Sequence, residues 1–210
     1  MAKGVTAIID YGVGNLFSIN SSLIACGADC VITSDAQDLK NASRIVLPGV
    51  GAFEDAAKKL RCTGLDKTLK ELAAKGKPLM GICLGMQLLF ERSYEYGCHE
   101  GLGLLKGSVC PIGDVIPQDY KIPHIGWNGL LMKKESPLMK YVKPGDCVYF
   151  VHSYYAADCD SAVIATAEYG AELTAAVAEG NVLGCQFHPE KSGDVGLKIL
   201  KAFVEMGEKK

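Results

Sequence analysis

Cys83 lies between two glycines in the run Lys77–Gln87, the clearest chemical signal in the sequence. The run reads as a strand, then Gly-x-Cys-x-Gly, then a helix, which is the cysteine form of the nucleophile elbow. The two glycines remove Cβ atoms that would clash at so sharp a turn. A helix beginning after Cys83 favours the thiolate, and its free backbone N–H groups can receive an oxyanion. The motif predicts a nucleophile for acyl transfer, although most free cysteines are ordinary packing residues.

A thiol nucleophile needs a base, and the base needs a group that fixes its tautomer. Among the four histidines, His188 follows the apolar run Val182–Phe187, which predicts a strand ending at this residue. Pro189 ends the ladder, and the carboxylate of Glu190 can turn back toward the imidazole. We expect His188 to be the base and Glu190 its orienting partner, although the tripeptide alone also fits an exposed turn.

The elements that must position these residues alternate between strand and helix in the first half of the chain. Helices are predicted from Leu16 to a stop at Gly27, over Ala52–Ala74 with a break near Gly64, and over Leu84–Arg92. Strands are predicted over Val5–Ile9, Cys30–Thr33, Arg44–Leu47 and Pro78–Ile82. This alternation predicts a mostly parallel sheet with helices on both faces.

The second half consists of short β runs separated by turns. The predicted strands are Gly107–Pro111, Asp146–His152, Ala162–Tyr169, Thr174–Ala178 and Val182–Phe187, and a helix over Val195–Met206 closes the chain. We expect these strands to extend the sheet in antiparallel fashion. The sequence contains no linker or internal repeat, so residues 1–210 are expected to form one α/β domain.

Composition limits the classes of function. The formal net charge of −2 argues against nucleic acid as the main ligand. Nine cysteines without a CxxC pair, and no apolar run long enough for a signal peptide or a membrane span, indicate a cytoplasmic protein with free thiols. We expect no metal site and no cofactor. The loop Gly12–Gly14 lacks the third glycine of a dinucleotide-binding fingerprint, so it is not expected to bind a nucleotide.

Gly81–Gln87 together with Gln186–Ser192 resembles the two motifs of the triad, or class I, glutamine amidotransferases. The resemblance implies a flavodoxin-like core and hydrolysis of L-glutamine to glutamate and ammonia through a cysteinyl thioester. In that chemistry Cys83 attacks the side-chain amide. His188 protonates the leaving ammonia and then activates water, while Glu190 holds His188.

Four further stretches resemble the glutaminase subunits of imidazole glycerol phosphate synthases, which serve histidine biosynthesis: Asp10–Asn15, Leu47–Phe53, Pro123–Asn128 and Tyr149–Tyr154. The resemblance implies a partner, a (β/α)₈-barrel cyclase that consumes the ammonia. Such a barrel needs roughly 250 residues, so the cyclase is expected to be a separate chain.

The resemblance also assigns residues around the nucleophile. Val50, Gly51 and the Leu84 N–H would form the oxyanion hole, with the Val50 peptide turned away until ligand-loaded cyclase docks. Gln87, His152 and Ser153 would contact glutamine. Residues at the cyclase interface or along the ammonia route would be Asn15, Pro123, His124, Trp127, Asn128, Tyr149 and Lys191.

Other functions are distinguishable by sequence. The glutaminase of vitamin B6 synthase has Gly-Gly-Glu-Ser where this chain has Pro48–Gly51, and amidotransferases for anthranilate, GMP or carbamoyl phosphate usually have a Gly-Pro segment there. A non-hydrolytic sensor with a cysteine elbow would need a broken His-Pro-Glu motif, which is intact here. A related peptidase would lack the glutamine contacts at Gln87 and His152.

Overall fold

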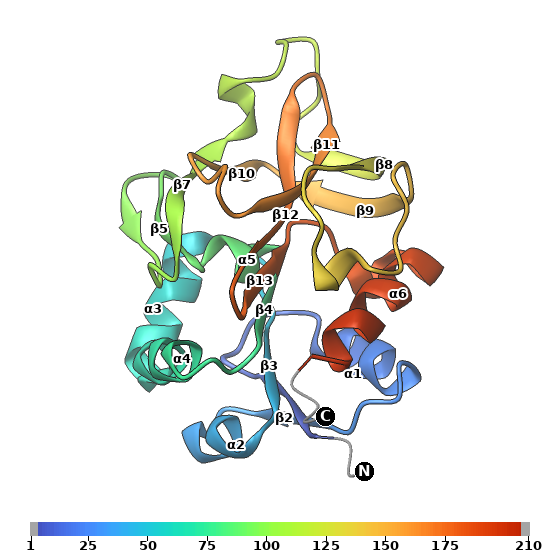
Figure 1. Cartoon of the computed structure of the whole chain (residues 1–210). Helices are drawn as coiled ribbons and strands as arrows, with labels where there is room; N and C mark the ends of the chain where they lie inside the picture. Colours follow the sequence, from blue (N-terminus) through green and yellow to red (C-terminus); the bar gives the residue numbers. More distant parts are fainter. Residues whose placement is uncertain (1–3, 207–210) are drawn as a thin grey trace.

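A nine-stranded mixed sheet runs through the centre of the molecule (Figure 1). The computed structural model describes residues 4–206. One half of the sheet is parallel and contains, in spatial order, β2 (Cys30–Thr33), β1 (Thr6–Ile9), β3 (Arg44–Leu47), β4 (Leu79–Ile82) and β13 (Val182–Cys185). This order is that of a flavodoxin-like sheet, in which ligands bind beyond the carboxyl ends of the strands.

The other half of the sheet is antiparallel. It continues from β13 through β12 (Glu172–Glu179), β11 (Val163–Glu168), β8 (His124–Met132) and β9 (Cys147–His152). The predicted fold class, a mostly parallel central sheet with an antiparallel extension, is confirmed. β13 itself belongs to the parallel half, where it pairs with β4.

Helices cover both faces of the parallel half (Figure 1). α1 (Leu16–Ala25) and α6 (Gly193–Val204) pack on one face, and α2 (Ala36–Asn41), α3 (Phe53–Thr63) and α4 (Leu65–Ala74) pack on the other. Because side chains alternate across a strand, Ile8 and Val46 enter the core under α1 and α6. Ile9 and Leu47 enter the core under α3 and α4. Continuous apolar strands are therefore required here, and the sequence has them.

A separate four-stranded sheet holds β10 (Tyr154–Ala157), β7 (Leu105–Pro111), β5 (Phe90–Ser93) and β6 (His99–Glu100). The predicted helix Leu84–Arg92 is wrong beyond its first turn, because α5 spans only Leu84–Gln87 and β5 follows. The carbonyls of Leu88 and Leu89 accept from the N–H groups of Leu102 and Leu104, so tertiary pairing replaces the helical pattern. The expectation that Gly107–Pro111 extends the main sheet is also wrong, since this run lies in β7.

The sequence pattern did not predict β5, β6, β8, β10 or α2. β8 contains Gly126 and Gly129, which weaken a strand signal, although it pairs with both β9 and β11. α2 is a short helix whose N-cap, Asp35, accepts a hydrogen bond from the Gln37 N–H at 2.8 Å. Three single turns of 3₁₀-helix complete the chain: η1 (Ile112–Asp114), η2 (Pro137–Met139) and η3 (Pro189–Lys191).

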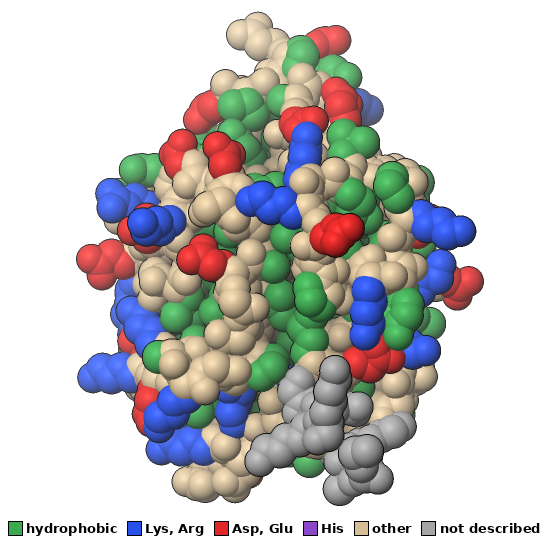
Figure 2. All heavy atoms as spheres, in the orientation of Figure 1, with side chains coloured by type: hydrophobic (Ala, Val, Ile, Leu, Met, Phe, Trp, Pro, Cys, Tyr) green, Lys and Arg blue, Asp and Glu red, His purple; other side chains and the backbone are tan. Residues whose placement is uncertain are grey.

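Within residues 4–206, no helix is long and apolar enough to cross a membrane. All nine cysteines are unpaired, three of them exposed. On the face shown in Figure 2, lysine and arginine side chains are interspersed with acidic ones, so this face has no extended area of one charge.

Candidate active site

Cys83 occupies a strained turn directly after β4. Its backbone has φ 54° and ψ −113°, a region that side chains other than glycine rarely adopt. Two backbone hydrogen bonds hold it there: Cys83 N–H donates to the Cys185 carbonyl at 2.7 Å, and Gln87 N–H donates to the Cys83 carbonyl at 3.2 Å. Strain of this kind persists only where surrounding structure enforces it, and it is typical of functional sites.

The glycines on either side of the nucleophile are required by contacts with their neighbours. A Cβ at residue 85 would overlap the Leu47 carbonyl of β3, and one at residue 81 would lie 2.5 Å from the Gly85 carbonyl oxygen. Real Cβ atoms essentially never come so close. The elbow therefore has its two glycines because the turn packs directly on β3, which also brings the loop after β3 beside Cys83.

The helix after the nucleophile is shorter than the sequence predicts. α5 has four residues, so its dipole is small and it stabilises the thiolate less than the predicted longer helix would. The Gln186 amide Nε2, 3.8 Å from the Cys83 sulfur, supplies an N–H in its place. The positive charge that can stabilise a thiolate at Cys83 comes instead from His188.

His188 reaches the nucleophile because β13 lies beside β4. Cys185 pairs with Ile82 in this parallel ladder, so the residues that follow the two strands emerge together at the carboxyl edge. His188 Nδ1 lies 2.8 Å from Glu190 Oε1, and both side chains are buried. Burial disfavours the imidazolium, but hydrogen bonds to Cys83 and Glu190 outweigh this and raise the pKa of His188 to about 9. The predicted Cys83, His188 and Glu190 therefore lie together: Cys83 and His188 line one cavity, and Glu190 is hydrogen-bonded to the ring of His188.

The turn that carries the histidine is tied to β9. His188 N–H donates to the Tyr149 carbonyl at 2.9 Å. The buried Ser192 hydroxyl donates to the His188 carbonyl at 2.6 Å and accepts from the Tyr149 N–H at 3.0 Å. This network fixes the position of the His188 backbone relative to the antiparallel half of the sheet.

The segment Pro48–Gly51 follows β3 and forms another wall of the site. A Cβ at residue 49 would lie 2.7 Å from the Gly85 nitrogen, so the segment packs against the elbow. The Tyr11 hydroxyl donates to the Pro48 carbonyl at 2.7 Å, and burial raises the pKa of Tyr11 and keeps this donor neutral. Val50 and Gly51 are exposed and face the same cavity as Cys83.

A cavity of about 610 Å³ contains Cys83 and His188. Val50, Gly51, Leu84, Gln87, His152, Ser153, Pro123 and Lys191 also line it, so the predicted oxyanion and glutamine residues lie around one space. Gln87 Nε2 donates to the Tyr154 carbonyl at 3.1 Å and to Gln186 Oε1 at 3.0 Å, which fixes its side chain. A larger cavity of about 800 Å³, between Met132 and Val142, holds none of the candidate catalytic residues.

Seven lining residues were not predicted as site residues from the sequence: Glu95, Tyr96, Pro111, Gly113, Ile122, Val151 and Tyr154. Glu95 and Tyr96 follow β5, and Tyr154 begins β10, so these three belong to strands or loops that the sequence pattern did not predict. Glu95 Oε2 accepts from the Phe53 N–H at 2.5 Å, and Tyr96 packs edge-on against Tyr154 with ring centroids 6.4 Å apart. Glu95 is the acidic side chain that lines this cavity.

Most residues expected at a partner interface are exposed or half-buried, and one of them, His124, is buried. Trp127 is 55% exposed and lies edge-on to Tyr149 with centroids 6.0 Å apart, and Lys191 Nζ lies 6.0 Å from the centre of the Tyr149 ring. Pro123 is exposed, and Asn15 is half-buried at the start of α1.

His124 does not lie on the surface as expected. It is 1% exposed, between the rings of Phe150 and Tyr169, because β8 turns alternate residues inward. In this arrangement the His124 side chain is not exposed, and its expected role at the interface or on the ammonia route stays a prediction. Asn128, on the same side of β8, is half-buried.

Comparison with known proteins adds family information to this geometry. Residues 7–206 match the family described as glutamine amidotransferase class-I. The chain is 54% identical to "Imidazole glycerol phosphate synthase subunit HisH" of Caldanaerobacter subterraneus subsp. tengcongensis, covering 95% of this chain and 97% of the relative. It is 50% identical to the protein of that name in a Geobacillus species, with 97% of each covered.

Solved structures show the same fold at lower identity. The structure described as PurLQS from Thermotoga maritima superposes with a TM-score of 0.74 at 21% identity, covering 96% of this chain and 98% of that one. Another, described as a glutamine amidotransferase, superposes with a TM-score of 0.74 at 20% identity, covering 95% of this chain and 99% of that one. At these identities the likeness concerns the fold alone.

Proposed function

The chain belongs to the class I glutamine amidotransferase family, and from this we propose that it is the glutaminase subunit of an imidazole glycerol phosphate synthase. Residues 1–210 act as one domain that hydrolyses L-glutamine and passes ammonia to a separate cyclase chain. The observation that carries the proposal is the hydrogen-bonded pair of His188 and Glu190 beside Cys83, with Cys83 and His188 both lining the cavity of about 610 Å³.

The reaction begins with the sulfur of Cys83. The thiolate attacks the side-chain amide carbon of glutamine, and the carbonyl oxygen becomes an oxyanion. We expect the Leu84 N–H and an N–H of the Val50–Gly51 segment to stabilise this oxyanion, because these residues line the same cavity as Cys83. His188 then donates its proton to the departing nitrogen, which leaves as ammonia, and a thioester remains. Water, deprotonated by His188, attacks the thioester and releases glutamate, restoring the thiolate and the imidazolium.

Recognition of glutamine uses the rest of the cavity wall. Its α-ammonium group suits the carboxylate of Glu95, and its α-carboxylate suits backbone N–H groups around His152 and Ser153. Gln87 lies below the substrate, held by Tyr154 and Gln186. A substrate with both charges and a side-chain amide therefore matches the site better than a neutral amide does.

The cyclase would cover the exposed apolar side chains near the cavity mouth. Ile122, Ile125 and Trp127 are each more than half exposed, and tryptophan is enriched among residues that anchor interfaces. Trp127 packs on Tyr149, whose backbone is hydrogen-bonded to the His188 turn. A partner docked on Trp127 and Tyr149 would lie one strand away from the catalytic His188. Ammonia released beside His188 would therefore have a short route to that partner.

Activity is gated at the oxyanion hole. Gly51 has φ +93°, and nothing lies within 4 Å of the position that a Cβ would occupy there, so no packing at this point opposes rotation of the peptide between Val50 and Gly51. In the proposed gate, the isolated chain holds this peptide with its carbonyl toward the site, and docked cyclase carrying its ligand turns the N–H inward. Ammonia is then formed only when an acceptor is present.

The test is glutamate release from glutamine by the purified chain, alone and with the cyclase plus its nucleotide ligand. We expect strong stimulation by the loaded cyclase and complete loss in Cys83→Ala. Activity that is independent of the cyclase would contradict the pathway and the gate while leaving a glutaminase. Cys62→Ala, which changes an exposed cysteine on α3 that does not line the cavity, is the matched control and should behave as the unmodified chain.

A further inference from the structure

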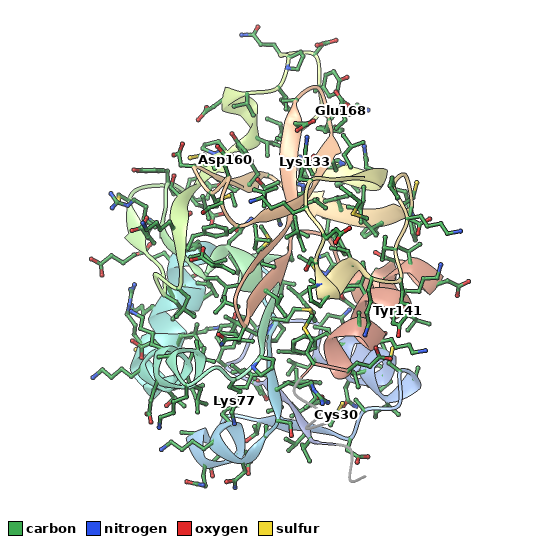
Figure 3. The ribbon with its side chains drawn as sticks, in the orientation of Figure 1. Cys30, Lys77, Lys133, Tyr141, Asp160 and Glu168 are labelled. Carbon is green, nitrogen blue, oxygen red and sulfur yellow. The ribbon has the colours of Figure 1, made fainter. Side chains whose placement is uncertain are left out.

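Two buried histidines form a hydrogen-bonded relay between the glutamine cavity and the surface. His152 lines the cavity, and its Nδ1 lies 2.8 Å from the Tyr154 carbonyl oxygen. Its Nε2 lies 3.0 Å from His124 Nδ1, and His124 Nε2 lies 2.8 Å from Asn128 Oδ1. Asn128 Nδ2 donates to the carbonyl of Glu168, which ends β11 near the top of Figure 3. The two rings are 6% and 1% exposed.

Both ends of the relay are hydrogen-bond acceptors. The Tyr154 carbonyl can only accept, and Asn128 presents its oxygen to His124 because its NH₂ group is directed at the Glu168 carbonyl. The three contacts of the two rings therefore require three N–H groups. Two neutral imidazoles carry only two, so one contact has no proton unless the pair is charged.

The surroundings keep the pair neutral. The pKa of His152 is lowered to about 4, mainly by burial and in addition by the neighbouring His124 and His188, while the bond to Tyr154 opposes the shift. Burial also lowers the pKa of His124, although its bond to Asn128 opposes this. The groups packed on His124 are the rings of Phe150 and Tyr169, which carry no negative charge at neutral pH.

With the protons on His152 Nδ1 and His124 Nε2, two unprotonated ring nitrogens would face each other at 3.0 Å, and the repulsion of their lone pairs disfavours this arrangement. A neutral pair that keeps the hydrogen bond between its rings has two arrangements. In one, both rings carry the proton on Nδ1, so His152 donates to the Tyr154 carbonyl and His124 donates to His152, while His124 and Asn128 face each other without a proton. In the other, both rings carry it on Nε2, the bond to Asn128 forms, and the bond to Tyr154 is lost. Each arrangement leaves one end without a donor, and the end at Asn128 is the one that solvent or a partner can reach.

We propose that His124 is a positioning residue of the glutamine pocket: through its ring, hydrogen bonding at Asn128 decides whether His152 donates to the Tyr154 carbonyl. This rests on the proposed function, in which that pocket binds glutamine. A hydrogen-bond donor from the docked partner, placed between Asn128 and the Glu168 carbonyl, lets the Asn128 amide turn its NH₂ group to His124. All contacts of both rings are then satisfied, with the protons on Nδ1.

The pocket end of the relay continues toward the nucleophile. The Tyr154 carbonyl also accepts from Gln87 Nε2, Gln87 bonds to Gln186, and Gln186 Nε2 lies 3.8 Å from the Cys83 sulfur. When His152 donates to Tyr154, that carbonyl is held from two sides and Gln87 has a fixed partner. The state of the relay should therefore alter the binding of glutamine more than the chemical step.

The test combines ring ¹⁵N spectroscopy with kinetics in Asn128→Leu, His124→Phe and the double variant. Asn128→Leu removes the competing acceptor, so both rings should carry the proton on Nδ1, whereas the unmodified chain should show exchange between the two arrangements. With the cyclase present, the KM for glutamine should fall about threefold while kcat stays within about twofold. Phenylalanine at 124 preserves the stacking, and Asn128→Leu should then have no effect on KM.

The control is Asn41→Leu, the same substitution at an exposed asparagine remote from the cavity. Equal effects of Asn128→Leu with and without His124 would overturn the proposal, as would a single, unexchanging proton on His152 Nδ1 in the unmodified chain. Changed ring protonation with an unchanged KM would also overturn the positioning role. Failure of the unmodified chain to hydrolyse glutamine would instead refute the proposed function, and the ring spectra would still decide whether the relay exists.

Discussion

At the scale of residues, His188 carries the largest electrostatic consequence. Its ring is buried between Cys83 and Glu190, and these partners raise its pKa to about 9 against the effect of burial. The imidazolium is therefore the resting form of the ring through neutral pH, which gives a ready proton donor beside the Cys83 sulfur. The Glu190 carboxylate contributes a negative charge that favours the imidazolium, and its hydrogen bond to Nδ1 fixes the orientation of the ring.

Glu190→Gln tests this contribution. The amide oxygen can still accept from Nδ1, but the negative charge is gone, so the pKa of His188 should fall. Glutaminase kcat/KM should drop about a hundredfold, and the alkaline limb of its pH profile, set by loss of the His188 proton near pH 9, should move to lower pH. A profile with the same alkaline limb would show that Glu190 does not set the proton affinity of the ring.

Gly85 is a residue at which even the smallest side chain should be poorly tolerated. A methyl group there overlaps the Leu47 carbonyl, and backbone on both sides prevents relief. Gly85→Ala should lower the free energy of unfolding by at least about 3 kcal/mol, measured by urea denaturation. Gly64→Ala is the comparison, because residue 64 has positive φ but open space, and it should lose only about 1 kcal/mol. Similar losses in both variants would contradict the steric argument.

At the scale of elements, the turn η3 and strand β9 act as one support for the histidine. Ser192 bonds to the His188 carbonyl and to the Tyr149 N–H, and its side chain is buried. This support lies between the catalytic ring of His188 and the aromatic pair formed by Trp127 and Tyr149. Movement of β9 is thus transmitted to His188 through three hydrogen bonds.

Ser192→Ala should lower kcat by roughly tenfold to a hundredfold because the catalytic ring loses its fixed position. The KM for glutamine should change little, since Ser192 does not line the cavity. Ser136→Ala removes a hydroxyl that accepts from the Leu138 N–H, remote from the site, and serves as the control for stability. A loss of kcat in Ser136→Ala as large as in Ser192→Ala would remove the case for a local effect.

Elements of the parallel half were predictable because their signals are local. Buried strands such as Arg44–Leu47 read as short apolar runs, and Gly64 divides α3 from α4 as expected. The triad residues were predictable for a similar reason, because each motif contains the glycine or proline residues that its own turn requires. The failures lie where pairing partners decide the structure: β5 replaces a helix because of hydrogen bonds to Leu102 and Leu104. Glu95, which follows β5, was missed for that reason.

His124 shows the same limit within the site. Its neighbours in sequence, Ile125 and Trp127, are exposed, so the stretch resembles a surface motif. The alternation of β8 nevertheless turns His124 inward, toward His152 on the paired strand β9. Such a contact depends on register, and register across twenty-eight residues of sequence cannot be deduced from local pattern alone.

At the scale of the whole molecule, the histidines make stability depend on pH in both directions. The folded pKa of His188 is raised, so its contribution is fully present below the unfolded value of about 6.5 and is lost as pH rises through 9. The folded pKa values of His152 and His124 are lowered. Their unfolded forms bind protons first, so stability falls as pH drops below about 6.5 toward 4.

The melting temperature of the unmodified chain should therefore decline on both sides of pH 6.5 as far as histidines contribute. In His188→Asn the alkaline part of that decline should become shallower while the acid part is retained. Differential scanning calorimetry of both proteins between pH 4 and 9.5 measures the difference, which cancels contributions common to the two. Identical slopes above neutral pH would show that His188 has the same proton affinity folded and unfolded.

The position of β13 has a consequence for synthesis of the protein. β13 is the last strand in the chain, yet it inserts between β4 and β12 at the middle of the sheet. While the ribosome is still making the last quarter of the chain, Cys83 is already present but has neither its base nor the neighbouring strand that supports its turn. Because distant segments pair late and domains fold as units, the nucleophile becomes competent only when translation is nearly finished. A nascent chain thus cannot release ammonia before its central sheet is complete.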